Sequence, residues 1–145
     1  MLKAISRVNF FFLNSTPRLK DRKELKRFLL SIFNKEKKKL ETINYLFTDD
    51  ESLLEINRRY LNHTFLTDII TFDLSNKGQP IIAEVYISIE RVKENASIHK
   101  TTFKKELHRV IFHGALHLCG YNDKTARQIT KMREKEDHYI AEYLG

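Results

Sequence analysis

The residues best suited to chemistry are two histidines four positions apart, followed by a glycine and an aspartate: His113, His117, Gly120 and Asp123. An α-helix turns about 100° and rises about 1.5 Å per residue, so positions 113 and 117 share one face and their imidazoles can bind one ion. In an unbroken helix, the side chain of Asp123 would point away from the face that His113 and His117 share. Gly120 can adopt the left-handed conformation that ends helices, which would let the chain return Asp123 to the same ion.

This set of side chains predicts a catalytic metal site rather than a closed structural one. Two imidazoles and one carboxylate leave a coordination position for water or substrate, and they suit zinc in tetrahedral geometry. We therefore expect one Zn²⁺ per chain, although Fe²⁺, Mn²⁺ or Ni²⁺ can use similar ligands. The apolar surroundings of His113 and His117 support this interpretation, because an unpaired imidazole is costly to bury.

Each of these residues also has an ordinary structural interpretation. Histidines four apart occur on many helices, and Asp123 could instead cap a last helix that begins with the capping box Thr125–Gln128. We expect Cys119 to be a small buried residue and not a ligand. Gly114 stands where zinc proteases of the His-Glu-x-x-His type carry their general base, which argues against that class. We expect Gly114 to leave room beside the metal for a bulky substrate.

The elements that must position this site alternate between strands and helices. Alternating or β-branched apolar segments predict strands at residues 4–13, 42–48, 68–73 and 81–89. Caps and apolar stripes predict helices that begin at Thr16-Pro17 and at the capping box Thr48–Glu51, and helices over residues 89–98, 102–118 and 125–143. This order predicts an α+β fold, a single domain over residues 1–145 with a mixed sheet of about four strands packed by about five helices. The metal site would lie on the helix 102–118 and the loop after it.

The composition restricts the class of protein and its partners. Lys and Arg number 26 against 19 Asp and Glu, and the formal charge of +7 favours a polyanionic partner such as RNA or DNA. The single cysteine rules out an internal disulfide and fits a reducing cytoplasm. No apolar run approaches the roughly 18 residues of a membrane span, so no membrane partner is expected. The sequence indicates no oligomeric state.

The motif His-Gly-x-Leu-His-Leu-x-Gly-Tyr at residues 113–121 resembles the signature of the YbeY family. Further segments are similar to that family in the same order, namely Ile56–Tyr60, Thr67–Phe72, Ala83–Ser88 and Glu106-Leu107. The resemblance implies a metal-dependent, single-strand-specific endoribonuclease of 16S rRNA 3′-end maturation and ribosome quality control. Its partners would be ribosomal RNA and the ribosome or its small-subunit proteins.

Two positions depart from the family pattern. The family's usual third ligand is histidine, whereas the matching residue here is Asp123. Carboxylates also bind zinc, so a three-ligand set is kept, although with one positive charge fewer. The family usually places an arginine after the tyrosine, and that position is Leu61 here. Arg58 lies three residues earlier, on roughly the same face of a helix, and is the candidate replacement.

The implied reaction is metal-assisted hydrolysis of a phosphodiester bond. Arg58 or Arg109 would stabilise the developing charge, and Arg109 would also contact the RNA. Asp68 and Glu84 are candidates for the general base. Two alternatives stay open: a ribosome-associated assembly factor with a mainly structural metal, and a metal hydrolase of a substrate other than RNA.

Overall fold

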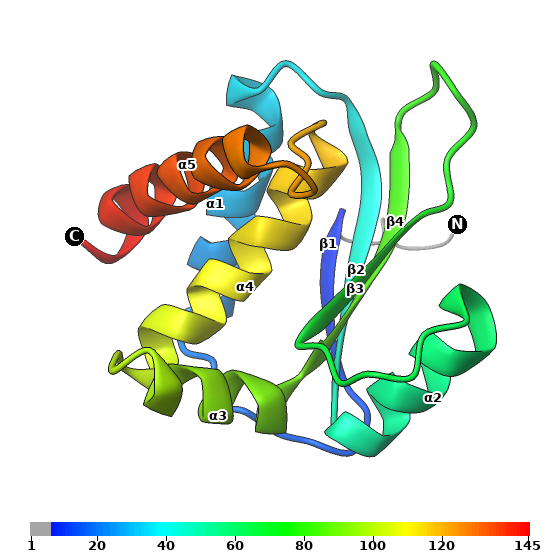
Figure 1. Cartoon of the computed structure of the whole chain (residues 1–145). Helices are drawn as coiled ribbons and strands as arrows, with labels where there is room; N and C mark the ends of the chain where they lie inside the picture. Colours follow the sequence, from blue (N-terminus) through cyan, green and yellow to red (C-terminus); the bar gives the residue numbers. More distant parts are fainter. Residues whose placement is uncertain (1–6) are drawn as a thin grey trace, which may run out of the picture.

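The computed structural model describes residues 7–145, in which strands and helices alternate. The order is β1 (Val8–Phe12), α1 (Arg22–Lys35), β2 (Leu40–Thr48), α2 (Asp50–Leu61), β3 (Ile69–Asp73), β4 (Ile81–Ser88), α3 (Ile89–Ile98), α4 (Phe103–Leu118) and α5 (Ala126–Leu144). Figure 1 shows α1, α3, α4 and α5 on one side of the sheet and α2 on the other. The predicted α+β fold, with a four-stranded mixed sheet and five helices, is confirmed for the described residues.

The sheet has the strand order β1-β2-β4-β3. The pairs β1–β2 and β2–β4 are parallel, whereas β3 runs antiparallel to β4 at one edge. Alternate residues of the two central strands are fully buried beneath the helices, namely Ile43, Tyr45, Phe47, Ala83, Val85 and Ile87. Because side chains alternate between the faces of a strand, this pattern fixes which face receives α4.

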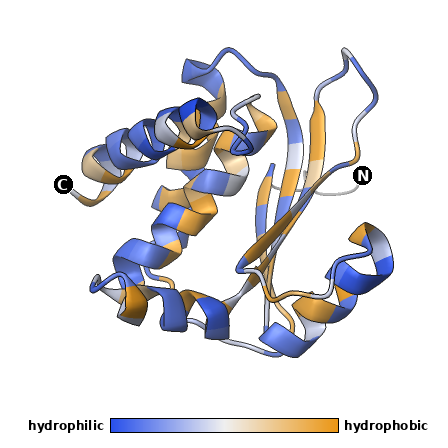
Figure 2. Ribbon diagram, in the orientation of Figure 1, coloured by the Kyte–Doolittle hydropathy of each residue, from blue (hydrophilic) through white to orange (hydrophobic). Residues whose placement is uncertain are grey.

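The core lies between this sheet face and the helices. α1 contributes Leu25, Leu29, Ile32 and Phe33, and α4 contributes residues along most of its length. Tyr45 anchors α4 to the sheet, because its hydroxyl donates to the carbonyl of Ile111 at 2.8 Å. Figure 2 shows hydrophobic residues along the strands and hydrophilic residues along the outer side of α5. Among the described helices, none has the length and hydropathy to cross a membrane.

The beginnings of the first two helices differ from the sequence prediction. α1 begins at Arg22 and not at Pro17, since Pro17 and Leu19 are buried in the irregular segment that precedes the helix. The cap of α2 is Asp49, whose carboxylate accepts from the backbone N–H of Ser52, whereas Thr48 ends β2. β1 lies within the predicted strand 4–13, of which residues 4–6 are outside the described part of the chain.

Candidate metal centre

The end of α4 has the geometry that its sequence predicts. The helix ends at Leu118, and Gly120 follows with a φ of 105°, which L-residues with a side chain rarely adopt. The N–H of Tyr121 then donates to the carbonyl of Leu116 at 3.1 Å, as in helices closed by a left-handed glycine. The chain turns back at this point and brings Asp123 beside α4.

His113 lies between two carboxylates. Its Nδ1 is 2.7 Å from Oε2 of Glu136, and its Nε2 is 3.3 Å from Oδ2 of Asp123. An ionised carboxylate only accepts hydrogen bonds, so Nδ1 carries a proton toward Glu136. In the neutral ring this leaves the Nε2 lone pair, on the side of Asp123, as the atom available to a metal.

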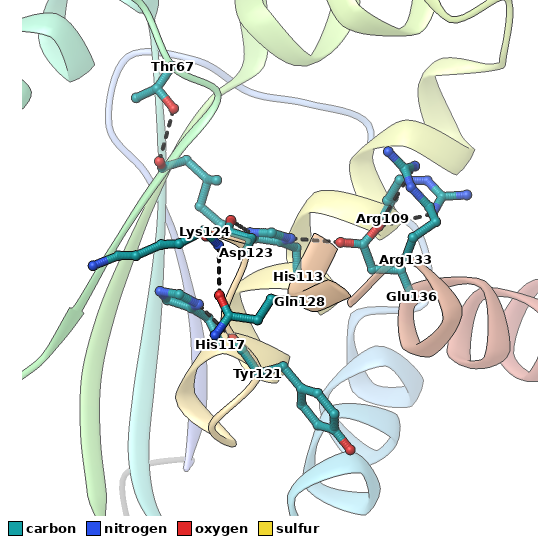
Figure 3. A network of polar contacts seen from close by, with 11 residues as sticks. Thr67, Arg109, His113, His117, Tyr121, Asp123, Lys124, Gln128, Arg133 and Glu136 are labelled. Atoms are coloured by element: carbon teal, nitrogen blue, oxygen red, sulfur yellow. Dashed lines mark hydrogen bonds and ion pairs between the residues drawn. The ribbon is translucent and has the colours of Figure 1, made fainter. Parts of the chain in front are cut away.

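His117 has the same tautomer for a different reason. Its Nδ1 is 2.8 Å from the backbone carbonyl of Tyr121, which also can only accept, so Nε2 is again the unprotonated nitrogen of the neutral ring. The rings of His113 and His117 are nearly parallel, with 12° between their planes and 6.1 Å between their centroids. Figure 3 shows both imidazoles together with Asp123.

The donor atoms fit zinc in type and, for one pair, in spacing. Two ligands of a tetrahedral zinc ion with bonds of about 2.0–2.2 Å are roughly 3.3–3.6 Å apart, and Nε2 of His113 and Oδ2 of Asp123 are 3.3 Å apart. Within residues 7–145, however, no three His, Cys, Asp or Glu side chains are grouped closely enough to hold a metal ion together. The structure thus pairs His113 with Asp123 and places His117 one helical turn away.

Glu136 is the residue of this site that the sequence interpretation missed. It comes from α5, is only 4% exposed, and accepts from Nη1 of Arg109 at 3.0 Å as well as from His113. Buried carboxylates are rare unless they are paired. One sequence signal was available, because Glu136 falls on the apolar stripe that also contains Met132, Tyr139 and Ile140.

The local charges raise the pKa of His113. Burial by itself lowers the pKa of this imidazole, but the hydrogen bond and charge of Glu136, together with Asp123 and Asp68, outweigh burial and raise it. The carboxylates therefore favour a positive charge at this point. A cation suits the position whether it is a proton or a metal ion.

Asp68 lies where a role in the same site is feasible. It lines a cavity of about 320 Å³ together with Asn95, His113, Asp123 and Glu136. Burial raises the pKa of Asp68, while the nearby His113 and the hydrogen bond from Asn95 act in the opposite direction. Its assignment as a catalytic group stays a prediction.

Glu84, Arg58 and Arg109 are placed less favourably than Asp68 for a catalytic role in this cavity. Glu84 and Arg58 are not among the described residues that line this cavity. Arg58 is 57% exposed and pairs with Glu55 at 3.6 Å. Arg109 lies at the cavity, but its side chain is only 16% exposed and binds Glu136 at 3.0 Å and Asp137 at 2.8 Å. This placement favours a structural role for Arg109 over contact with phosphate.

The expectation that Gly114 leaves room for substrate is wrong. A Cβ at this position would lie 3.1 Å from Cδ1 of Ile69 and 3.1 Å from Cγ1 of Val85. Gly114 therefore faces β3 and β4 and permits α4 to approach the sheet closely. Cys119 is buried as expected, and burial raises the pKa of its thiol to about 12.

Comparisons with known proteins agree with this architecture. The family model described as Endoribonuclease YbeY matches residues 13–144. A protein of that name from Cytophaga hutchinsonii is 48% identical over 129 residues, covering 88% of this chain and 90% of the relative. Another from Flavobacterium psychrophilum is 52% identical over 110 residues, covering 76% and 78%. A solution structure from Thermotoga maritima matches with a TM-score of 0.63 and 29% identity over 90% of this chain and 86% of that chain.

Proposed function

Because the chain belongs to the YbeY family of endoribonucleases, we propose that it hydrolyses internal phosphodiester bonds of single-stranded ribosomal RNA. The 3′ end of 16S rRNA is the expected site of action, and ribosome quality control is the expected context. The observation that carries the proposal is that Nδ1 of both His113 and His117 lies against a hydrogen-bond acceptor, which directs Nε2 of each neutral ring toward a metal, with Asp123 beside His113.

We assign one Zn²⁺ per chain to His113, His117 and Asp123. The bound ion would supply a water of lowered pKa and a positive charge near the scissile phosphate. Glu136 fixes the ring of His113, and the carbonyl of Tyr121 fixes the ring of His117. Such partners of ligating histidines orient the ring and increase its basicity.

Asp68 is the proposed proton acceptor. It lies in the same cavity as His113 and Asp123, and burial raises its pKa, which makes the carboxylate a stronger base. Arg58 remains the proposed replacement for the family arginine, since its guanidinium is exposed on α2 and is available to an RNA phosphate. Replacing Arg58 by alanine should slow cleavage far more than replacing Arg59.

The RNA would be held through its phosphates by the excess of basic residues. The formal charge of +7 supports this, and binding that depends on phosphate neutralisation weakens as salt is added. Ribosomal small-subunit proteins are the proposed protein partners.

The test is endonucleolytic cleavage of a fluorescent single-stranded RNA by zinc-loaded protein. We expect His113→Ala to abolish cleavage, and His138→Ala, which alters an exposed histidine of α5, to leave it unchanged. Equal cleavage by the wild type and His113→Ala would contradict the assignment. A wild type that binds ribosomes and zinc without cutting RNA would favour an assembly factor instead.

A further inference from the structure

A second carboxylate, separate from the proposed ligands, holds the loop that follows α4. Glu36 lies immediately after α1, and its side chain is 12% exposed. Its Oε1 accepts from the hydroxyl of Tyr121 at 2.7 Å. Its Oε2 accepts from the hydroxyl of Tyr139 at 2.6 Å and from Nζ of Lys135 at 3.0 Å. One side chain thus joins the end of α1, the loop after α4, and α5.

Tyr121 connects this carboxylate to the candidate metal centre. Its backbone carbonyl accepts from Nδ1 of His117, and it precedes Asp123 by two residues. Figure 3 shows its carbonyl end beside the imidazole of His117 and its phenol directed away from the two histidines. The phenol of Tyr121 therefore binds Glu36, while the backbone carbonyl of the same residue orients the imidazole of His117.

The neighbours of Glu36 favour its negatively charged carboxylate form. Burial raises the pKa of this carboxyl, but hydrogen bonds from Tyr139, Tyr121 and Lys135 outweigh burial and lower it below its ordinary value. Nζ of Lys135 also lies 5.4 Å from the centroid of the Tyr121 ring. A carboxylate that accepts from three donors restrains all three of them, because moving any one leaves a partly buried polar group without a hydrogen bond.

We propose that Glu36 is a positioning residue for metal binding. Through Tyr121 it fixes the loop from Gly120 to Asp123, and so sets the orientation of His117 and the place of Asp123. The inference rests on the proposed metal site. Loss of an outer partner of a metal ligand typically weakens metal binding by about 10- to 100-fold, and an effect transmitted through Tyr121 should lie near the lower limit.

Two tyrosines provide a matched pair of variants. Tyr121→Phe and Tyr139→Phe each remove one hydroxyl that donates to Glu36, but only Tyr121 belongs to the ligand loop. The measurements are the Zn²⁺ dissociation constant, by chelator competition, and the melting temperature of the metal-free protein. We expect Tyr121→Phe to weaken Zn²⁺ binding about 10-fold, and Tyr139→Phe to weaken it less than about threefold. The two variants should lower the melting temperature of the metal-free protein by similar amounts.

A second readout follows the histidine directly. In the metal-free wild type, the ¹⁵N shifts of His117 should show a protonated Nδ1, and in Tyr121→Phe and Glu36→Gln they should show a mixture of tautomers. Unchanged Zn²⁺ affinity and unchanged tautomer in Tyr121→Phe, or equal weakening by both phenylalanine variants, would overturn the proposal.

His113→Ala, measured in parallel, separates this inference from the proposed function. If that variant loses Zn²⁺ while Tyr121→Phe does not, the metal site stands and only the positioning role of Glu36 fails. If His113→Ala binds Zn²⁺ as the wild type does, the metal site itself fails, and the positioning role fails with it.

Discussion

At the scale of single residues, the two histidines of the candidate site are held by different acceptors. His113 donates to a buried carboxylate, and His117 donates to a backbone carbonyl. A carboxylate partner makes an imidazole a stronger base than a neutral partner does. His113 should therefore contribute more to metal affinity than His117, and loss of the negative charge of its partner Glu136 should weaken metal binding.

Replacing Glu136 by glutamine tests that partner. The substitution removes the negative charge and allows the amide to turn a donor toward His113, so Zn²⁺ should bind about 10- to 100-fold more weakly. Chelator competition measures the change, and Glu134→Gln, at an exposed position of the same helix, is the control. Equal affinities in the two variants would contradict the role assigned to Glu136.

His108 predicts a pH dependence of stability. Burial lowers the pKa of this imidazole below its ordinary value of 6.5, even though the hydrogen bond to the carbonyl of Lys104 acts against burial. The unfolded chain then binds a proton at His108 more readily than the folded chain. Stability from this group is therefore present above pH 6.5 and is lost as the pH falls below it, by at most about 1.4 kcal/mol per pH unit.

Urea unfolding at about pH 5 and about pH 7.5 measures this effect. The difference between the wild type and His108→Gln isolates it, because the other titrating groups are common to both proteins. The wild type should lose more stability than the variant on acidification. The same pH dependence in both proteins would show that His108 does not titrate as described.

At the scale of elements, the sequence predicted best what depends on local signals. The span of α5 was correct within one residue because Thr125 and Gln128 form the capping box that the sequence contains. The predicted start of α1 was wrong because Pro17 and Leu19 are buried in the segment before the helix, and this burial outweighs a local helix signal. The four-residue spacing also predicted that His113 and His117 share one face of α4, where their rings are nearly parallel. Their role as metal ligands stays a prediction.

The supporting residues of the site could not be predicted from spacing. The contact of His113 with Glu136 joins residues 23 apart, and that of Tyr121 with Glu36 joins residues 85 apart. Both contacts exist only because α5 packs against α4 and the end of α1 approaches the same loop. Amphipathic periodicity shows that these helices bury a face, but not which polar atoms meet across it.

The position of Gly114 provides a test at this scale. Gly114→Leu would force a side chain against Ile69 and Val85, where even a Cβ is 3.1 Å from each, and should destabilise the protein by roughly 1–3 kcal/mol or more. Chemical denaturation measures the loss, with Lys104→Leu at an exposed position of α4 as the control. Unchanged stability would restore the discarded idea of open space at Gly114.

At the scale of the whole molecule, the excess of basic residues should govern binding of RNA. Affinity for a single-stranded RNA should fall roughly tenfold or more between about 50 and about 200 mM salt if several phosphates are contacted. Fluorescence anisotropy with the His113→Ala variant, which we expect not to cut RNA, measures binding without cleavage. An affinity that does not change with salt would favour a substrate other than RNA.

The central claim is that Asp123 completes a zinc site with His113 and His117 and that this site cuts RNA. The most direct measurement is the zinc content of the wild type and of Asp123→Ala after dialysis, beside their rates of RNA cleavage. We expect about one zinc per wild-type chain, and a parallel loss of zinc and cleavage in the variant. Full zinc content and wild-type cleavage in Asp123→Ala would contradict the central claim.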